Sequence, residues 1–348
     1  MKNHNKTTSE RKKDHIELCL NESVLFNEKT SGFEKYDFDH FAITEVDYNK
    51  INLTTKFFGT QINYPFLISC MTGGTSEAKS INSNMAIVAN ELGIPIGVGS
   101  QRQALEDLSY HDSYKIIRHN AKSVPVLGNI GAAQIASMKN LDQVKYLIDL
   151  VEADVMVIHI NPAQEIIQEN GDTSFKGLIK NINKITKEIK IPFIAKEVGS
   201  GINKKAARIL LENGIRGIDV AGAGGTSWTA VEIMNKENDI NNEFWNWGLP
   251  TSYCIKEVNK LKKKHYFTLI ASGGITNGFD IAKSLILGAD ISASARPILL
   301  SIVNDGVDKT IIKIKEMFDD VKKIMFLTDS TNIKELKKTR LIKKEELY

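Results

Sequence analysis

Two short segments near the C-terminal end of the chain have the residue types of a phosphate site. Gly273 and Gly274 follow the apolar run 268–271, and Arg296 follows a second run at 291–293. Backbone N–H groups of glycines can approach an anion closely, and the N-terminus of a following helix favours negative charge. Two adjacent strand–helix units of this kind predict a phosphate site after the last two strands of a (β/α)8 barrel.

A lysine provides a second chemical signal. Lys196 directly follows the apolar run 192–195, and a lysine at the end of a buried strand is costly unless it has an anionic or electron-rich partner. The pyrimidine end of a flavin is such a partner, because an anion forms there on reduction. Thr72 and Asn129 could bond to the same ring system.

Eight short apolar runs would position these residues, and a helical stretch follows each one. The runs are continuous rather than alternating, which indicates parallel strands covered on both faces. Eight such units in series favour a closed (β/α)8 TIM barrel over an open sheet. The predicted strands are 65–69, 94–98, 125–127, 155–158, 192–195, 217–220, 268–271 and 291–293.

The other segments are predicted to extend this barrel at both ends. The predicted division is an N-terminal arm and lead-in at 1–63, the barrel at 64–328 and a charged tail at 329–348. Within the lead-in we expect a helix at 16–20, a strand at 51–57 and a cover, formed by 21–60, over the bottom of the barrel. We also expect helices at 81–92 and 307–327, a solvated or subunit-contacting tail, and a lid in the long, tryptophan-bearing connection 222–252.

Composition excludes several classes of function. The 348 residues carry a net charge of only +3, with lysines scattered along helices, which does not suggest nucleic-acid binding. Cys19, Cys70 and Cys254 lie far apart without a CxxC pair, which argues against a disulfide framework or a zinc site and fits a reducing cytosol. No apolar run approaches the ~18 residues that span a bilayer. We therefore expect a cytoplasmic protein without membrane or nucleic-acid partners.

Hydrogen-bonding side chains follow nearly every predicted strand, where the active-site residues of a barrel gather. Any one of them can be a capped turn or a satisfied polar group of the barrel wall, and a lone His159 is as often the latter. As a set they favour an active site, because a purely structural barrel gains nothing from buried charge at one rim. The set comprises Thr72, Ser100, Arg102, Asn129, His159, Asn161, Gln164, Glu165, Lys196, Asp219, Thr226, Gly273, Gly274 and Arg296.

A series of short stretches, in order along 11–299, resembles the type 2 isopentenyl-diphosphate isomerases, a family of FMN-dependent (β/α)8 enzymes. HxNxxQE and GxGGT are specific in combination, whereas a GG after a strand alone is weak. The stretches are RK (11–12), MTGG (71–74), GSQR (99–102), NIGAAQ (129–134), HINPAQE (159–165), KEVGSG (196–201), GAGGTSW (222–228), NWGLPT (246–251), ASGGI (271–275) and SARP (294–297).

The resemblance implies a role for each matching residue. FMN would be bound by Cys70, Met71, Thr72, Ser100, Asn129, Lys196 and Thr226, with its phosphate at Gly273, Gly274, Ile275, Ala295 and Arg296. The substrate diphosphate would contact Arg11, Lys12, Ser100, Gln101, Arg102 and Gln164. His159, Asn161, Gln164 and Glu232 would serve the reacting end, and Glu165 would hold Mg²⁺, a cation that takes one or two carboxylates plus substrate phosphates. Ala221 stands where some relatives are expected to carry a hydroxyl, which leaves one flavin hydrogen bond in question.

The implied reaction is a 1,3-proton shift between isopentenyl diphosphate and dimethylallyl diphosphate, in isoprenoid biosynthesis. It requires reduced FMN, with NADPH or NADH as the reductant. Two hypotheses for the proton carrier stay open: the reduced flavin near its N5, or a relay through Gln164 and Glu232. The resemblance also implies a homotetramer or homo-octamer.

Two other functions remain as alternatives. An FMN-dependent 2-hydroxy-acid oxidase shares the barrel and the phosphate site, but needs a histidine base and an arginine pair beside the flavin. The end of the sixth strand, residues 221–226, contains neither histidine nor arginine. A flavin-binding or structural barrel without turnover is opposed by the polar residues gathered at one rim.

Overall fold

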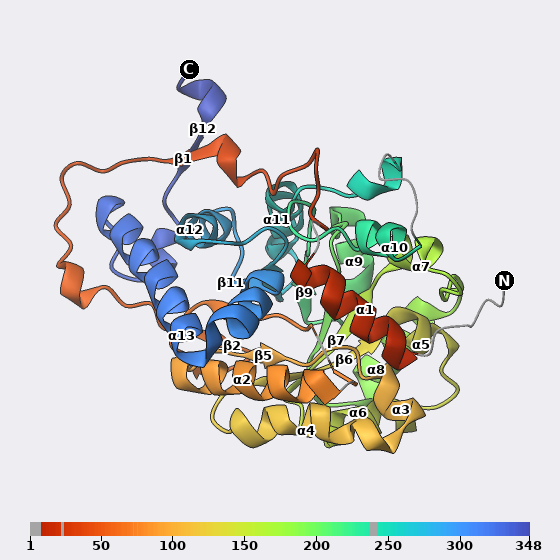
Figure 1. The fold of residues 1–348 in the computed structure, drawn as a ribbon. Coiled ribbons are helices and arrows are strands. Elements are labelled where there is room, and N and C mark those ends of the chain that lie inside the picture. Colours follow the sequence, from red (N-terminus) through yellow and green to blue (C-terminus); the bar gives the residue numbers. More distant parts are fainter. Residues whose placement is uncertain (1–7, 22–23, 72, 75, 237–241) are drawn as a thin grey trace.

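Eight parallel strands form a closed barrel in the computed structural model, which describes residues 8–21, 24–71, 73–74, 76–236 and 242–348 (Figure 1). Neighbouring strands follow the order β10-β11-β4-β5-β6-β7-β8-β9 around the barrel. All eight predicted strands and the predicted closure are confirmed. The strands are β4 (Phe66–Ile68), β5 (Ile96–Gly97), β6 (Val126–Gly131), β7 (Val155–Ile160), β8 (Phe193–Glu197), β9 (Gly217–Asp219), β10 (Thr268–Ala271) and β11 (Ile291–Ser294).

Helices cover the outside of the barrel, because each has an apolar face that packs on the strands and a polar face in solvent. The predicted helix 81–92 lies within α2, and the predicted helix 307–327 is the second half of α13. Gly306, with φ 82°, breaks α13 into two straight parts. The covering helices are α2 (Ser76–Leu92), α3 (Arg102–Glu106), α4 (His111–Asn120), α5 (Ala132–Ser137), α6 (Asp142–Leu150), α7 (Pro162–Ile167), α8 (Leu178–Glu188), α9 (Lys204–Glu212), α10 (Trp228–Asn235), α11 (Thr251–Asn259), α12 (Gly278–Ile286) and α13 (Arg296–Leu327).

A β-hairpin closes the N-terminal ends of the barrel strands. β2 (Thr55–Phe57) pairs antiparallel with β3 (Thr60–Ile62), and the side chains of Phe57 and Ile62 are buried in the cluster that fills the barrel interior. The predicted bottom cover is confirmed for this hairpin. The predicted single strand 51–57 is wrong in its first part: Tyr48–Lys50 form a short 3-10 helix, η2, and only the last three residues of the run pair as a strand.

The N-terminal helix lies over the opposite end of the barrel. α1 (Thr8–Asn21) packs beside α10 and α13 (Figure 1). Residues 24–31 continue along the loop after β9, where the N–H of Phe26 donates to the carbonyl of Gly225. The prediction that all of 21–60 covers the bottom is therefore wrong for this stretch. It follows the rim because Gly224, which has no side chain, leaves room for the backbone of Ser31.

The C-terminal segment is anchored to the rest of the chain. β12 (Leu341–Lys343) pairs antiparallel with β1 (Tyr36–Phe38), and this small sheet projects from the barrel (Figure 1). α14 (Ile333–Leu336) buries both of its terminal side chains, so the segment predicted as solvated is partly core. The division into domains at 63 and 328 stays a prediction. No helix of the described residues is long and apolar enough to cross a membrane.

Candidate active site

A cavity of about 390 Å³ lies at the C-terminal ends of the barrel strands. It is the one place where all eight strands converge, so the residues at the strand ends are brought together by the closure of the barrel itself. Each strand contributes to the wall: Cys70 after β4, Ser100 after β5, Asn129 in β6, His159 in β7, Lys196 in β8, Ala221 after β9, Ser272 after β10 and Ser294 in β11.

One side of the cavity is backbone. We call residues 222–226 and 273–275 the glycine wall. Gly273 and Gly274 have φ of 98° and 74°, in the left-handed region that favours glycine. A Cβ on Gly225 would lie 2.6 Å from the nitrogen of Gly274, and one on Gly273 would collide with the carbonyl oxygen of Gly222. The two loops therefore fit together only because they lack side chains.

The glycine wall has the chemistry of a phosphate site. Within the described part of the chain, the N–H groups of Gly273, Gly274 and Ile275 have no hydrogen-bond partner. Beside them Ala295 and Arg296 line the cavity at the start of α13. N–H groups gathered at a helix start favour an anion, so the predicted phosphate residues are brought together.

Ala221, next to the glycine wall, has a φ of 36° and lines the cavity. A positive φ is strained for a residue with a Cβ, and such strain is often found at functional sites. The carbonyl of Ala221 accepts from the N–H of Gly201, which fixes this conformation. The expectation about a missing hydroxyl at this position stays untested.

The floor of the cavity is a row of neighbouring polar side chains. In the strand register His159 lies beside Lys196, and Lys196 beside Asp219. Nδ1 of His159 is 2.9 Å from Oδ1 of Asn129, and Nζ of Lys196 donates to the carbonyl of Glu197 at 2.7 Å. Burial raises the pKa of Asp219, and the positive charge of Lys196 opposes that rise. The buried carboxylate is thus the anionic partner that Lys196 requires.

Gln101 differs from the other predicted substrate residues because it is absent from the cavity wall. Its side chain is fully buried, accepts from the N–H of Asn129 at 2.8 Å and donates to the carbonyl of Leu147 at 2.9 Å. The amide thus joins β6 to α6. The structure does not bring the Gln101 side chain into the site.

The motif HINPAQE forms a buried polar cluster after β7. Nδ2 of Asn161 donates to Oε1 of Gln164 at 3.1 Å and to Oε1 of Glu165 at 3.0 Å. Nε2 of Gln164 donates to Oε1 of Glu232 at 2.7 Å, although Glu232 comes from α10, 68 residues away. Within the described residues, the buried Oδ1 of Asn161 has no hydrogen-bond partner. A buried, unsatisfied oxygen is rare and marks a place for a ligand.

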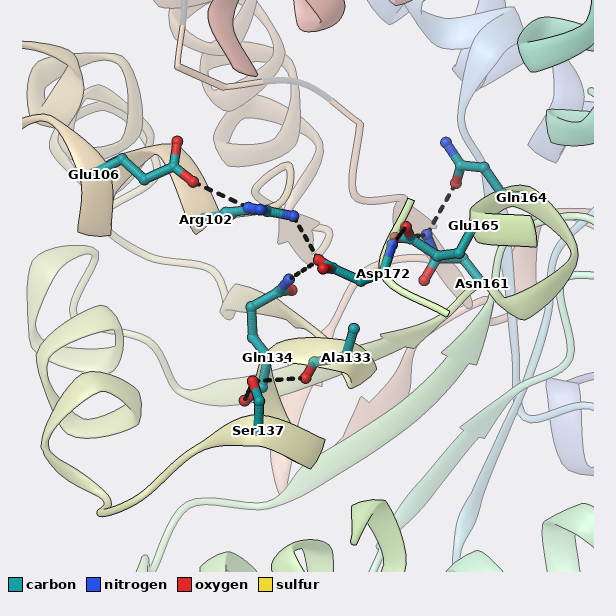
Figure 2. Close-up of polar contacts among 9 residues, drawn as sticks. All are labelled: Arg102, Glu106, Ala133, Gln134, Ser137, Asn161, Gln164, Glu165 and Asp172. Atoms are coloured by element: carbon teal, nitrogen blue, oxygen red, sulfur yellow. Dashed lines mark hydrogen bonds and ion pairs between the residues drawn. The ribbon is translucent and has the colours of Figure 1, made fainter. Parts of the chain in front are cut away.

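Arg102 lies at the edge of this cluster, between two carboxylates (Figure 2). Its Nε donates to Glu106 at 3.0 Å and its Nη1 to Oδ2 of Asp172 at 2.7 Å. Asp172 also accepts from Nε2 of Gln134 at 3.3 Å, and its N–H donates to Oε2 of Glu165 at 2.6 Å. Burial raises the pKa of Glu165, whereas the hydrogen bonds from Asp172 and Asn161 act in the opposite direction.

A cover closes the cavity on the side of α1. His15 lies in the wall, with Nε2 3.1 Å from Oε1 of Glu232 and its ring edge-on to Trp228 at 5.4 Å. Trp228 also lines the cavity, so the predicted lid is supported at this residue. Trp245 instead binds the carbonyl of Leu25 through Nε1 at 2.9 Å. Sequence reasoning missed His15 and Asp172, because neither follows a strand.

The remaining predicted residues divide into two groups. Thr72 lies outside the described residues, and Arg11 and Lys12 lie in α1 but their side chains are likewise outside the description. The others line the cavity: Cys70, Met71, Ser100, Thr226, Gly273, Gly274, Ile275, Ala295 and Arg296. Oxidation chemistry at Cys70 is disfavoured, because burial raises the pKa of its thiol to about 12.

Known proteins match the chain over nearly its whole length. A protein named isopentenyl-diphosphate delta-isomerase from Chlorobium phaeobacteroides is 42% identical over 348 residues, which cover 96% of this chain and 95% of the relative. One of the same name from a Nostoc species is 42% identical and covers 95% and 94%. This chain belongs to the isopentenyl-diphosphate delta-isomerase family. It also belongs to the family described as FMN-dependent dehydrogenase, whose model matches residues 4–123 and 129–343.

Solved structures confirm the fold of this family member. A lactate oxidase from Pediococcus acidilactici superposes with a TM-score of 0.65 at 15% identity, covering 94% of this chain and 86% of that protein. A mandelate oxidase superposes with a TM-score of 0.66 at 12% identity, covering 95% of both chains. At this identity the likeness concerns the barrel alone.

Proposed function

We propose that this family member interconverts isopentenyl diphosphate and dimethylallyl diphosphate by a 1,3-proton shift. The observation that carries the proposal is the convergence, in one cavity, of the glycine wall with the buried cluster of Asn161, Gln164 and Glu232. The first suits the phosphate of FMN. The second offers amide and carboxylate groups that can hold or move a proton beside an otherwise apolar substrate.

The described residues fit FMN. The unbonded N–H groups at 273–275 would take its phosphate, and the floor residues Asn129 and Lys196 would contact its ring system. Cys70, Met71, Ser100 and Thr226 would complete this contact from neighbouring strand ends. When bound and reduced, FMN would supply the proton-transfer chemistry. The positive charge of Lys196 would stabilise the negative charge that the reduced ring carries.

The substrate diphosphate would bind beside Arg102, together with Arg11, Lys12 and Ser100. Glu165 is proposed to hold Mg²⁺ there. Among the described residues no group of three or more His, Cys, Asp or Glu is arranged to hold a metal ion. The oxygens of Glu165 and Asn161 nevertheless suit a hard cation, which would take its other ligands from the diphosphate and water. We therefore expect cation and diphosphate to bind together.

The protein's own part in the proton shift is orientation and the exclusion of water. Gln164 is held between Asn161 and Glu232, so its amide has a fixed direction. His15 and Trp228 place α1 and α10 over the same cluster. A cover of this kind would protect a short-lived carbocation from water. Proton transfer by the flavin and relay through Gln164 and Glu232 both stay open.

Other properties of the enzyme are proposals that the family resemblance supports. NADPH is proposed as the reductant, visiting the flavin transiently, because the sequence carries no GxGxxG unit of its own. A homotetramer or homo-octamer and a cytoplasmic location are proposed on the same resemblance. The oxidase alternative is opposed by the glycine wall, which has no histidine or arginine at the end of β9.

The test is an anaerobic assay with FMN, Mg²⁺, NADPH and isopentenyl diphosphate that follows dimethylallyl diphosphate. Product formed without stoichiometric NADPH consumption is the expected result. Removal of Mg²⁺ with a chelator should abolish product formation while leaving FMN bound, since the cation and the flavin phosphate bind at different walls. A protein that binds and reduces FMN but forms no product would contradict the proposal, and lactate-dependent bleaching would favour the oxidase.

A further inference from the structure

Asp172 joins two parts of the site that no strand end connects. It lies on the connection between α7 and α8, and its carboxylate receives hydrogen bonds from Arg102 and Gln134 while its backbone N–H binds Glu165 (Figure 2). Arg102 is the proposed diphosphate residue and Glu165 the proposed cation residue. Among the contacts of the described residues, Asp172 alone touches both.

The local sequence supports this double contact. A Cβ on Gly171 would collide with the backbone carbonyl of Glu165, so glycine allows the connection to pass directly against the end of α7. The following N–H then reaches Oε2 of Glu165 at 2.6 Å. Any side chain at 171 would hold Asp172 away from the carboxylate. The close approach is thus built into the pair Gly171–Asp172.

Burial separates this arrangement from an ordinary surface ion pair. The side chains of Arg102 and Asp172 are 36% and 42% exposed, and an isolated pair of this kind contributes little to stability. Glu165 is only 8% exposed, and a buried carboxylate depends on each hydrogen bond that orients it. The partly exposed pair therefore matters because it fixes the N–H that orients a buried ligand group.

We propose that Asp172 is a positioning residue that sets Arg102 and Glu165 relative to each other, so that diphosphate and cation bind as one unit. This proposal rests on the proposed function, because it takes Arg102 and Glu165 in the roles given there. Asp172 need not touch either ligand. Hydrogen-bond partners of metal ligands commonly change metal affinity by about 10- to 100-fold when they are removed.

Glu106 provides the matched control. It also accepts a hydrogen bond from Arg102, at 3.0 Å, but it contacts Arg102 from the side away from Glu165 (Figure 2). Glu106→Ala and Asp172→Ala each remove one of the two carboxylates that hold the guanidinium. Asp172→Asn keeps an oxygen that can accept from Arg102 and serves as the rescue variant.

The experiment uses the oxidised FMN-bound enzyme, which does not turn over. Calorimetry measures the affinity for inorganic pyrophosphate, and electron paramagnetic resonance measures how much Mn²⁺ binds in its presence. Both alanine variants should weaken pyrophosphate about three- to tenfold, the range of a partly exposed charged contact. Only Asp172→Ala should also raise the Mn²⁺ concentration for half-saturation, by about tenfold. Asp172→Asn should recover most of the Mn²⁺ affinity.

Two results would overturn the proposal. One is a Mn²⁺ requirement in Asp172→Ala that is no higher than in Glu106→Ala. The other is tighter pyrophosphate binding in Asp172→Ala, which would show that the carboxylate competes with the ligand for Arg102. Failure of the proposed function has a different signature: the unaltered enzyme would then bind pyrophosphate and Mn²⁺ together and yet fail to isomerise isopentenyl diphosphate.

Discussion

The glycine wall and the side-chain wall of the cavity offer a ligand different chemistry. The glycine wall, after β9 and β10, presents backbone N–H groups, whereas the side-chain wall, after β5 to β8, presents an arginine, amides, a carboxylate, a histidine and a lysine. The side-chain wall consists of Arg102, Asn129, His159, Asn161, Gln164, Glu165 and Lys196. The first matches an anion that is always bound, and the second matches groups that change during a reaction.

The two walls also differ in what they depend on. The glycine wall depends on the absence of side chains, since Gly225 and Gly273 each approach the backbone of the opposite loop. The side-chain wall depends on hydrogen bonds between residues distant in sequence, such as Gln164 with Glu232. Substitution in the glycine wall should therefore affect cofactor binding, and substitution in the side-chain wall should affect turnover with the cofactor in place.

The largest effect is expected for Gly273→Ala. A Cβ at this position would collide with the carbonyl of Gly222 and would also be strained at φ 98°. Overpacking and strain together cost roughly 4 kcal/mol, so FMN affinity should fall on the order of 1,000-fold. The flavin absorbance of the purified protein and a titration with FMN measure this.

Gly59→Ala is the control for strain alone. Gly59 has a φ of 91° in the β2–β3 turn, but nothing lies within 4 Å of the position of its Cβ. This variant should lose roughly 1–2 kcal/mol of stability in urea and keep its FMN. If Gly273→Ala binds FMN as Gly59→Ala does, close backbone approach is not what defines the glycine wall.

The next effect concerns turnover. Gln164→Ala removes the amide between Asn161 and Glu232, and should lower kcat about 100-fold while FMN stays bound. Gln168→Ala is the matched control, because Gln168 also lines the cavity and lies one turn further along, at the end of α7. It should keep kcat within about threefold. Near-normal turnover in Gln164→Ala would remove this amide from the mechanism.

Sequence predicted the barrel and most of the rim, because both follow from local signals. Continuous apolar runs mark buried parallel strands, and the end of each strand places a residue such as His159 or Lys196 at the rim without further information. Gln101 shows the limit of this reasoning. It directly precedes Arg102 at a strand end, but its side chain turns into the wall to satisfy Asn129 and Leu147.

The cover and the link between the walls required contacts that no local pattern encodes. Arg296 donates to the carbonyl of Cys19 at 2.7 Å, across 277 residues, and this bond helps to place α1 over the cavity. Asp172 lies within a long connection, so its position follows from Arg102 and Glu165 rather than from any strand. A glycine–aspartate pair after a specific motif was the only local sign of it.

The smallest effect tests the boundary between the two walls, where Lys196 faces the proposed flavin. Lys196→Met removes a positive charge that favours reduced over oxidised FMN, so the midpoint potential of bound FMN should become more negative. The neighbouring Asp219 already offsets part of that charge, and a net loss of about 1–2 kcal/mol corresponds to a shift of roughly 20–40 mV for two electrons.

Lys29→Met serves as the control for this shift. Lys29 likewise donates from Nζ to a backbone carbonyl, that of Gly248, at 2.9 Å, but it is not part of the cavity wall. Both variants lose one positive charge from the protein, so only proximity to the flavin distinguishes them. An equal shift in both would show a general charge effect. A shift to more positive potential in Lys196→Met would mean that Asp219 loses its charge with the lysine, and that the side-chain wall regulates the flavin through the pair rather than through Lys196 alone.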